Sequence, residues 1–464
     1  MADPPPVVAL RMSTPPDAER PALLQPFTLR GTTIANRMVV APMCQYCVTD
    51  GLVGDYHLVH LGRFALGGFG LVIVEATGVT ADGRISPGDV GLWNDEQVPG
   101  LARVAAFLEE HGSVPGIQLG HAGGKANTLR PWDGHGPVTP ENARPGDEPW
   151  TTVSPSGVPM GEGWPEPHVL TVEEMAGVRD AFVAATRRAL AAGFRLVEVH
   201  AAHGYLLNQF LSPLTNRRTD SYGGSLENRM RFPLEVVRAV RAALPEDAPL
   251  VVRISAVDAS REGTTLDDSV AFAHELKAAG VDAVHVSGGG IGAGWEHPIG
   301  YGYQVPFAAR IKAEVGIPTI AVGLIVDAEQ ADTVVSEGSA DLVAFAREAQ
   351  DDPNFALHAA RTLTKGSYDT YPVQAGPRLA ARDRLLLHAP DASLAEDLAA
   401  LRAWVPPRLP IGGGDLVGMG LPRGPMVAST LRKVERRWIE EGFPDLHRTR
   451  ALAQAEAAQA LRDL

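Results

Sequence analysis

The chain has 464 residues, of which 45% are hydrophobic and 21% charged. This length suits a barrel of roughly 250 residues with additions, and no apolar run approaches the roughly 20 residues needed to cross a bilayer. The formal net charge of −14, from 41 basic and 55 acidic residues, argues against a general polyanion binder. We therefore expect a soluble globular protein with no membrane partner.

The N-terminal segment, residues 1–22, is rich in Pro and lacks an apolar stretch long enough for a signal peptide. We interpret it as a disordered arm on a cytoplasmic protein. The two cysteines of the chain, Cys44 and Cys47, form a Cys-x-x-Cys pair. A zinc site needs about four ligands, and a thioredoxin-like dithiol opens a helix, whereas this pair follows an apolar run. We therefore predict no metal site.

From Ile34 onward, short β-branched runs alternate with amphipathic segments of helical length. Eight such repeats predict a parallel sheet, and they fit a closed (β/α)8 TIM barrel, an α/β fold, better than an open sheet. The predicted strands are residues 38–41, 71–75, 116–119, 196–200, 250–255, 283–286, 319–322 and 342–345. The predicted helices are residues 55–67, 96–111, 171–192, 227–243, 266–279, 304–315, 327–337 and a segment after 353.

The active sites of such barrels lie at the carboxyl ends of the strands. The stretch His200-Ala201-Ala202-His203-Gly204-Tyr205 stands at the end of the fourth predicted strand. If the strand ends near His200 and the chain then turns, both imidazoles reach one acceptor atom such as a substrate carbonyl oxygen, and Gly204 permits the turn. The simpler alternative makes one His a helix cap and the other a half-buried core residue.

Three later strand ends carry the elements of a phosphate site. Ser287-Gly288-Gly289 follows the sixth predicted strand, Gly323 the seventh and Arg347 the eighth. Glycine-turn N–H groups, a helix N-terminus and a guanidinium make the usual phosphate cradle of this fold. The alternative is that the glycines only form tight turns and that Arg347 makes a surface salt bridge. It accounts for any one element but not for all three.

Two strand residues indicate which phosphorylated ligand binds. Arg253 can stabilise the negative charge near N1 of a reduced flavin ring, and Gln118 can both donate to and accept from its pyrimidine edge. Flavin mononucleotide (FMN) fits these groups best. The alternative for Arg253 is a buried structural ion pair.

Residues from about 23 to 376 resemble the old yellow enzyme family of FMN-dependent ene-reductases. Ala41-Pro42-Met43-Cys44-Gln45-Tyr46 is similar to the thermophilic-like subgroup of that family. The longest shared signature starts at His200 and runs through Leu206, Phe210-Leu211-Ser212-Pro213, Asn216, Arg218, Asp220, Tyr222-Gly223-Gly224-Ser225, Glu227-Asn228-Arg229 and Arg231-Phe232. Two positions depart from the common pattern: Ala346 stands where Gly is usual, and Gly124 where Arg is usual.

The resemblance implies an oxidoreductase that uses NADPH or NADH as reductant and FMN as cofactor. Hydride reaches the β-carbon of an activated alkene whose carbonyl oxygen is held by His200 and His203, and Tyr205 protonates the α-carbon. Cys44 tunes the flavin and is the fourth catalytic residue, while Tyr46 contacts the substrate. Alternative acceptors for the same site are quinones, nitro compounds and N-heterocycles.

The resemblance also implies the residues around the cofactor and the state of assembly. The implied cofactor-binding residues are Ala41, Pro42, Met43, Cys44, Ala76, Gln118, Arg253, Ser287, Gly288, Gly289, Gly323, Ala346 and Arg347. The substrate is a small enone-type molecule, and we expect a homo-oligomer, either a dimer or a tetramer.

The last region, residues 377–464, is predicted to be a helical extension. Its glycine-rich run 410–416, with the later pairs Gly420-Leu421, Gly424-Pro425 and Trp438-Ile439, resembles the C-terminal region of CCA-adding tRNA nucleotidyltransferases over about 80 residues. The catalytic head of those enzymes is missing, so nucleotidyl transfer is not expected. Four basic residues, Arg432, Lys433, Arg436 and Arg437, indicate a solvated face, and the alternative is a barrel fused to an RNA-binding module.

Overall fold

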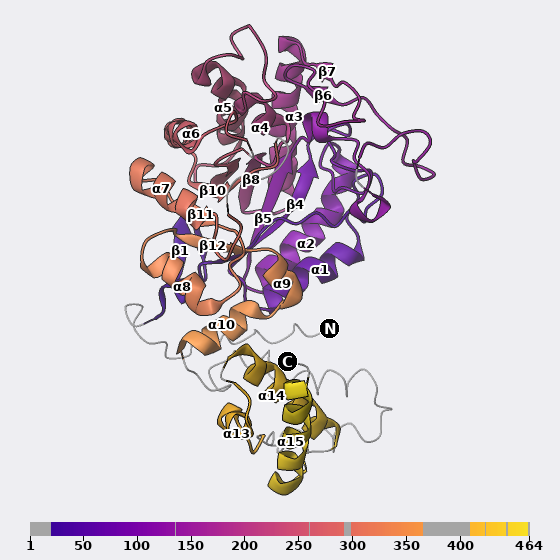
Figure 1. The fold of residues 1–464 in the computed structure, drawn as a ribbon. Coiled ribbons are helices and arrows are strands. Elements are labelled where there is room, and N and C mark those ends of the chain that lie inside the picture. Colours follow the sequence, from indigo (N-terminus) through magenta and orange to yellow (C-terminus); the bar gives the residue numbers. More distant parts are fainter. Residues whose placement is uncertain are drawn as a thin grey trace, which may run out of the picture. The chain divides into compact units, whose positions relative to one another are not determined.

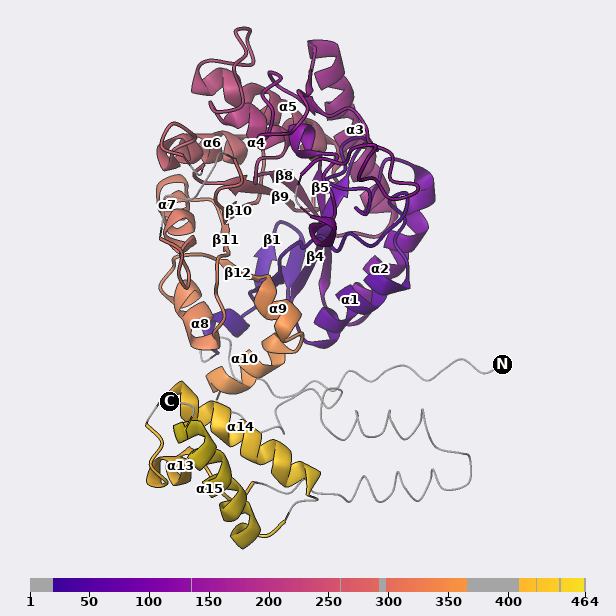
Figure 2. The same ribbon diagram turned by 45° about the vertical axis from the view of Figure 1, so that its right-hand side comes forward.

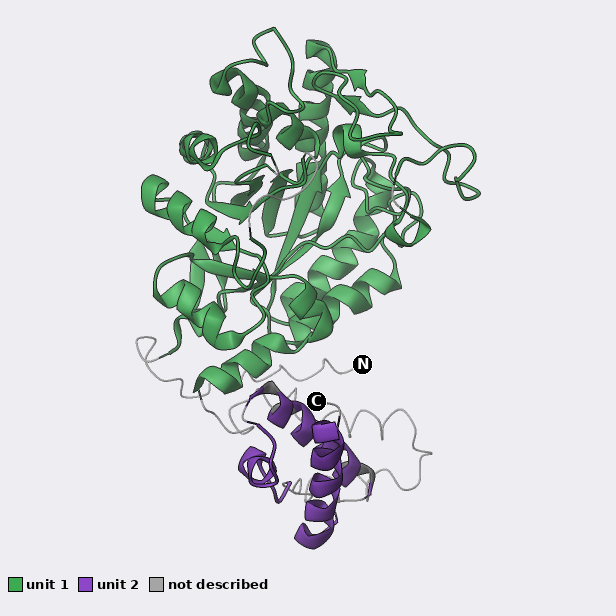
Figure 3. Ribbon diagram, viewed as in Figure 1, with its two compact units in different colours: residues 1–375 green, residues 376–464 purple. Residues whose placement is uncertain are grey.

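The computed structural model describes residues 20–134, 136–258, 260–291, 298–364, 409–422, 424–441 and 444–462. The chain forms two compact units, residues 1–375 and 376–464 (Figure 3). Each unit has a hydrophobic core of its own. Most of the predicted N-terminal arm, and the domain boundary predicted at residue 376, lie outside the described residues.

The first unit contains a closed barrel of eight parallel strands (Figures 1 and 2). Its strands are β3 (Met38–Val40), β4 (Leu71–Gly78), β5 (Val114–Gly120), β8 (Leu196–Ala201), β9 (Leu250–Ser255), β10 (Ala283–Ser287), β11 (Thr319–Ala321) and β12 (Leu342–Phe345). They pair in this order, and β12 closes the barrel against β3. The TIM barrel and all eight predicted strands are confirmed.

Helices surround the barrel, and their apolar faces explain their positions. In α3, the buried residues Met175, Val178, Phe182, Ala185 and Ala189 recur every three or four positions, which is the period of a helix packed on one side. The helices that match the prediction are α1 (Asp55–Leu66), α2 (Val98–Glu110), α3 (Val172–Ala191), α5 (Leu226–Ala243), α6 (Leu266–Ala278), α7 (Val305–Val315), α8 (Ala328–Ser336) and α10 (Phe355–Thr364).

The short elements were not predicted. All six residues of α4 (Leu206–Leu211) are buried, Asn208 and Gln209 included, so this helix has no exposed face and no amphipathic period. The other additions are the hairpin β1 (Phe27–Leu29) and β2 (Thr32–Ile34), the pair β6 (Val153–Ser154) and β7 (His168–Val169), helix α9 (Arg347–Asp351), and the 3-10 turns η2 (Ala22–Leu24), η3 (Asp95–Gln97), η4 (Gly123–Lys125) and η5 (Pro131–Asp133).

Alternation along the strands decides which side chains face the barrel interior. In β9, Val252 packs outward into the core beneath the helices and Val251 belongs to the interior cluster, so Arg253 also faces inward. The interior cluster contains the first or second residues of most strands, together with Leu29 and Ile34 of the β1–β2 hairpin. The amino end of the barrel is therefore filled with apolar side chains, and the polar interior residues lie toward the carboxyl end.

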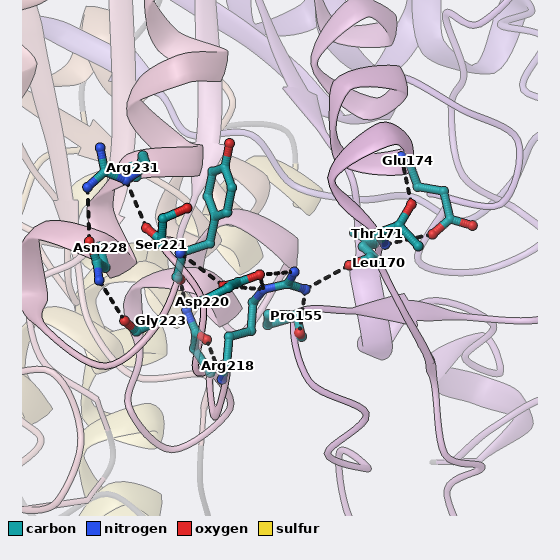
Figure 4. A network of polar contacts seen from close by, with 12 residues as sticks. Pro155, Leu170, Thr171, Glu174, Arg218, Asp220, Ser221, Gly223, Asn228 and Arg231 are labelled. Atoms are coloured by element: carbon teal, nitrogen blue, oxygen red, sulfur yellow. Dashed lines mark hydrogen bonds and ion pairs between the residues drawn. The ribbon is translucent and has the colours of Figure 1, made fainter.

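The polar residues of the long signature brace the loop that follows α4 (Figure 4). Arg218 donates through Nη1 to the carbonyl oxygens of Pro155 (3.0 Å) and Leu170 (2.7 Å), and it pairs with Asp220 at 2.6 Å. Leu170 precedes Thr171, the residue that caps α3. This part of the signature therefore ties the loop to the β6–β7 segment and to α3.

The second unit is helical over its described residues. Helices α13 (Gly413–Gly418), α14 (Pro425–Glu440) and α15 (Leu446–Arg462) enclose a core that includes Leu416, Val434, Trp438, Leu452 and Ala453. The prediction of a helical extension is confirmed for this part of the chain. Across the described residues of both units, every helix is too short or too polar to span a bilayer.

Candidate active site

Neighbouring strands bring the predicted residues together at the carboxyl end of the barrel. His200 of β8 is the register partner of Arg253 in β9, and Arg253 is the partner of His285 in β10. All three residues are buried. Because paired residues of adjacent strands face the same side of a sheet, the three side chains line the barrel interior in one row.

The two imidazoles meet in a turn that only special backbone angles allow. His200 Nε2 and His203 Nδ1 lie 3.3 Å apart, and the ring planes are 88° to each other. Strand β8 ends at Ala201, after which His203 has φ 59° and Gly204 has φ 77°. Positive φ is uncommon for a residue other than glycine. The backbone N–H of His203 donates to Ser255 Oγ at 2.9 Å and holds the turn in place.

Neighbouring groups decide where the imidazoles carry their protons. The Ala202 N–H donates to His200 Nδ1 at 3.2 Å, which places the proton of His200 on Nε2, the nitrogen that faces His203. His203 Nε2 lies 2.7 Å from Ser287 Oγ. A hydroxyl can donate or accept, so rotation of Ser287 allows His203 to carry its proton on either nitrogen.

Tyr205 lies edge-on to the first imidazole. Its ring centroid is 4.9 Å from that of His200, and the two planes meet at 87°. Tyr205 and Cys44 both pack against a small apolar cluster that contains Ala76. The catalytic residues inferred from the sequence are therefore gathered around one spot, with the predicted cofactor residue Ala76 beside them.

Burial keeps the ionisable groups of this spot neutral. It holds the pKa of His200 and of His203 well below the ordinary value, and the charge of Arg253 acts in the same direction. Burial raises the pKa of Tyr205 well above its ordinary value. Burial, with the nearby Asp89, does the same for the Cys44 thiol. The site presents two neutral imidazoles beside a protonated phenol and a protonated thiol.

Cys44 and Tyr46 lie on the loop that follows β3, and the side chain of Glu75 fixes this loop. Tyr46 has φ 56°, and the N–H of Gln45 donates to Glu75 Oε1 at 3.0 Å. Glu75 also pairs with His57 Nε2 at 3.1 Å, and both side chains are 1% exposed. Glu75 and His57 were missed in the sequence, although an acidic residue in the apolar run 71–75 was a usable signal.

An open pocket lies beside Arg253 at the ends of β10, β11 and β12. It holds about 540 Å³ of empty space, part of which is open to solvent. Among the described residues, the buried Arg253 Nε and Gln304 Oε1 have no hydrogen-bond partner. Since buried polar atoms are normally paired, this pocket fits a polar ligand such as FMN. The predicted cofactor residues that line it are Arg253, Ser287, Gly323, Ala346 and Arg347.

The other predicted cofactor residues do not belong to the lining of this pocket. The N–H of Gly289 donates to the Val257 carbonyl at 2.8 Å, so this glycine shapes the turn and has no free N–H for a phosphate. The Ala41 N–H donates to the Phe345 carbonyl at 2.9 Å, at the junction of β3 and β12. Pro42, Met43 and Gly288 follow their strands as expected.

A buried hydrogen-bond chain fixes the amide of Gln118. Gln118 Nε2 donates to Glu198 Oε1 at 2.6 Å, and Glu198 Oε2 lies 2.7 Å from His285 Nδ1. Burial alone raises the pKa of Glu198, but His285 and Arg253 hold it below the ordinary value. Glu198 and His285 were not predicted as site residues. Their inward positions in strands otherwise made of apolar residues were the available signal.

Two further residues of the site were also missed. Gln209 of α4 donates through Nε2 to the Gly204 carbonyl at 2.7 Å and accepts from the Gly124 N–H at 3.1 Å. Lys125 donates through Nζ to the His203 carbonyl at 2.8 Å. Among the described residues, no group of three or more His, Cys, Asp or Glu side chains is placed to hold a metal ion.

The sequence and the fold both have known relatives. Residues 22–366 match the NADH:flavin oxidoreductase / NADH oxidase family. The chain is 45% identical over 343 residues to an NADPH dehydrogenase of Geobacillus thermodenitrificans, covering 74% of this chain and 94% of that protein. An NADPH dehydrogenase of Listeria innocua is 44% identical over 74% of this chain and 95% of its own.

Among solved structures, morphinone reductase superposes with a TM-score of 0.61 at 28% identity, covering 75% of this chain and 91% of that one. A 2-naphthoyl-CoA reductase superposes with a TM-score of 0.65 at 26% identity, over 74% of this chain and 52% of the other. These matches confirm the resemblance to old yellow enzymes. The chain belongs to the NADH:flavin oxidoreductase / NADH oxidase family and is an FMN-dependent oxidoreductase that takes its electrons from a reduced nicotinamide.

Proposed function

We propose that this enzyme is an ene-reductase of the thermophilic-like old yellow enzyme subgroup, which reduces activated alkenes such as α,β-unsaturated carbonyls. The observation that carries the proposal is the protonated phenol of Tyr205 beside two neutral imidazoles, with its ring centroid 4.9 Å from that of His200. A reaction that adds hydride to one carbon and a proton to the next needs an oxygen-binding pair and a general acid in one place. The relatives named NADPH dehydrogenase support NADPH as the electron source.

The imidazole pair holds the substrate oxygen. His200 carries its proton on Nε2, because Nδ1 accepts from the Ala202 N–H. When the Ser287 hydroxyl donates to His203 Nε2, His203 carries its proton on Nδ1. Both protonated nitrogens then face the space between the rings. A substrate oxygen placed beside this pair, rather than in the 3.3 Å gap between the two nitrogens, accepts one hydrogen bond from each. These bonds stabilise its growing negative charge as hydride reaches the β-carbon.

The pocket beside Arg253 suits FMN by its chemistry. Arg253 and Arg347 supply positive charge for the ring and the phosphate, and the Gly323 turn allows a close backbone approach. Bound FMN would supply hydride transfer from the nicotinamide to the alkene, a chemistry that no side chain of the protein provides. The other residues proposed around it are Ala41, Pro42, Met43, Cys44, Ala76, Gln118, Ser287, Gly288, Gly289 and Ala346.

Tyr205 supplies the proton that completes the reduction. Because burial raises the pKa of Tyr205, the phenol stays protonated at neutral pH and yields its proton only to a strong base, such as the α-carbon after hydride has reached the β-carbon. Tyr46 is proposed to contact the substrate from the opposite loop, and the Cys44 thiol to tune the flavin. Both lie on the loop that Glu75 holds through the Gln45 N–H.

Isotope labelling tests this function. The purified holoenzyme is given 2-cyclohexen-1-one with NADPH deuterated at the transferred position, and in a second reaction unlabelled NADPH in deuterium oxide. We expect label from the cofactor on the β-carbon in the first product, and label from the solvent on the α-carbon in the second. Failure to form the saturated ketone, while NADPH is still consumed with a quinone present, would contradict the proposal.

Reduction of quinones, nitro compounds or N-heterocycles is the alternative function of the same site. A quinone takes hydride without protonation at carbon, so its reduction has no need of a phenol placed beside the imidazole pair. The position of Tyr205 therefore favours the alkene.

We further propose a cytoplasmic homo-oligomer, either a dimer or a tetramer. The support is a set of exposed apolar side chains on α1, Tyr56 (53% exposed), Val59 (70%) and Leu66 (56%), since exposed apolar groups close together are typical of interfaces. Sedimentation velocity measures the assembly. A monomer at micromolar concentration would contradict this part of the proposal.

We propose that the oxidoreductase reaction does not require the second unit. Its resemblance to the C-terminal region of CCA-adding enzymes suggests RNA, but the basic residues of α14 favour a solvated face, because Lys433 and Arg436 are exposed and Arg437 pairs with Glu456 at 3.0 Å. Removal of residues 377–464 is expected to leave FMN content and turnover unchanged. Loss of flavin on truncation, or specific tRNA binding by the full chain, would contradict this assignment.

A further inference from the structure

We propose that Lys125 is a further functional residue: its ammonium group positions the His203 turn and stabilises the negative charge that forms on Tyr205 as the phenol gives up its proton. This inference rests on the proposed ene-reductase function. It assigns a role to a residue outside the oxygen-binding pair and outside the cofactor pocket.

Lys125 joins three loops at the carboxyl end of the barrel. It ends the η4 turn that follows β5, and its Nζ donates to the carbonyl oxygens of His203 (2.8 Å) and Gly290 (3.1 Å). His203 follows β8, and Gly290 follows β10. One side chain from the loop after the third barrel strand therefore fixes the loops that follow the fourth and the sixth strands.

The two loops that Lys125 joins approach each other too closely for side chains. A Cβ on Gly290 would lie 2.3 Å from His203 Cα, and a Cβ on Gly204 would lie 2.3 Å from the Gly290 carbonyl oxygen. His203, Gly204 and Gly290 all have positive φ. The carbonyls of His203 and Gly290 therefore converge, and their partial negative charges favour a cation between them.

The same ammonium group lies over the phenol. Lys125 Nζ is 5.3 Å from the centroid of the Tyr205 ring, within the range of a cation–π contact. A cation in this position is worth more to a phenolate than to a phenol, so it acts where charge develops rather than in the ground state. Burial lowers the pKa of Lys125, while its two carbonyl contacts favour the charged form.

The groups around Tyr205 differ in their effect on the ionisation of its phenol. The groups that face Tyr205 are Cys44, Tyr46, Asp89 and Arg253, and the first three raise its pKa while Arg253 lowers it. Lys125 gives the ring a second cation in addition to Arg253. The positive charge of Lys125 also helps hold the pKa of both active-site imidazoles below the ordinary value, so the pair stays neutral.

The test compares Lys125→Met, Lys125→Arg and a control in which the same kind of contact is removed elsewhere. Lys277 is the matched control, because its Nζ also donates to two carbonyls, those of Val315 (2.8 Å) and Gly316 (3.0 Å), at the end of α7. Each FMN-loaded variant is assayed with NADPH and two acceptors: 2-cyclohexen-1-one, which needs protonation at carbon, and ferricyanide, which does not.

We expect Lys125→Met to lower enone turnover about 10- to 100-fold, as for loss of one charged contact and a cation–π contact, with ferricyanide reduction within about twofold of the parent. The solvent deuterium isotope effect on enone turnover should rise, and Lys125→Arg should restore most of the rate. Lys277→Met should behave as the parent. Equal loss with both acceptors, or no loss with either, would overturn the inference.

Phenol binding gives a readout that does not depend on the substrate. We expect the anion of p-hydroxybenzaldehyde to bind the oxygen site of the oxidised holoenzyme, where a long-wavelength charge-transfer band would measure its binding. We expect Lys125→Met to weaken its binding about tenfold at pH 8 and Lys277→Met to leave it unchanged. Unchanged binding in Lys125→Met would overturn the inference. An enzyme that reduces no enone but shows the tenfold loss would instead refute the ene-reductase function alone.

Discussion

The backbone of the His203–Gly204 turn and the side chains of the pocket beside it differ in how their polar atoms are paired. Around His203 and Gly204, the turn is held by Ser255, Gln209 and Lys125, each at 2.7 to 2.9 Å. In the pocket beside it, Arg253 Nε and Gln304 Oε1 are buried without a partner among the described residues. The paired half is held by groups of the protein itself, which suits a reacting centre. The unpaired half holds polar groups that a bound cofactor satisfies.

The largest expected effect comes from removing the general acid of the paired half. Tyr205→Phe keeps the ring but not the hydroxyl, so we expect enone turnover to fall about 10²- to 10⁴-fold with FMN affinity unchanged. Steady-state assays and flavin titration measure the two quantities. Tyr222→Phe is the control, because the Tyr222 hydroxyl donates to Glu235 at 3.2 Å outside the site. A Tyr205→Phe enzyme that keeps parental enone turnover would break the proposed division of roles.

The unpaired half is probed by Arg253→Met, which removes the buried guanidinium and keeps much of its volume. We expect FMN affinity to fall about 10- to 150-fold, the usual range for one charge-assisted hydrogen bond. Because Arg253 also offsets the buried charge of Glu198, the unfolding temperature of the apoprotein should fall as well. Quenching of FMN fluorescence measures the affinity, and the exposed Arg310→Met serves as the control. If Arg253→Met destabilises the apoprotein and binds FMN normally, Arg253 is a structural ion-pair residue instead.

A third expectation concerns acid stability. Burial lowers the pKa of His121 to about 4. Below about pH 6.5, His121 is therefore protonated in the unfolded chain but stays neutral in the folded chain. Stability is therefore lost as pH falls from about 6.5 to about 4, by about 3 kcal/mol for this residue. Asp89 acts in the opposite direction, because burial raises its pKa to about 7. The stability that protonated Asp89 contributes to the folded chain is lost as the pH rises from about 4 to 7.

The measurement is the unfolding temperature across this pH range. In the parent, His121 Nδ1 accepts a hydrogen bond from the Gly123 N–H at 3.0 Å, and His121→Gln keeps an acceptor at this position. This variant should lose less stability than the parent as the pH falls. The exposed His274→Gln should follow the parent. An acid limb of the same slope in His121→Gln would place the titrating group elsewhere.

Sequence patterns predicted the barrel because each strand places apolar residues on both of its faces. They also predicted His200, His203, Tyr205 and Arg253, whose polar groups stand at strand ends or inside apolar runs. They missed Glu198, Lys125 and Gln209, because each has a hydrogen-bond partner about 80 positions away in the chain. Pairing across that distance depends on strand register, which local patterns do not specify.

The smallest expected effect concerns Gly124, where the common family pattern has Arg. A Cβ at this position would meet Pro167, Ser154 and Gln209 at 3.4 to 3.7 Å, which is ordinary contact. Gly124→Ala is therefore expected to change the free energy of unfolding by less than about 1 kcal/mol, and toward higher stability, because it restricts the unfolded chain. Denaturant titration measures the change.

The neighbouring glycine supplies the contrast. Gly123 has φ 62°, and a Cβ there would lie 2.6 Å from Gln209 Oε1 and 3.0 Å from Leu206 Cα, so Gly123→Ala should cost more than about 1 kcal/mol. It should also lower enone turnover, because Gln209 holds the Gly204 carbonyl of the catalytic turn. Equal effects at the two positions would mean that the loop after β5 rearranges freely, and the paired half of the mouth would then not be rigid.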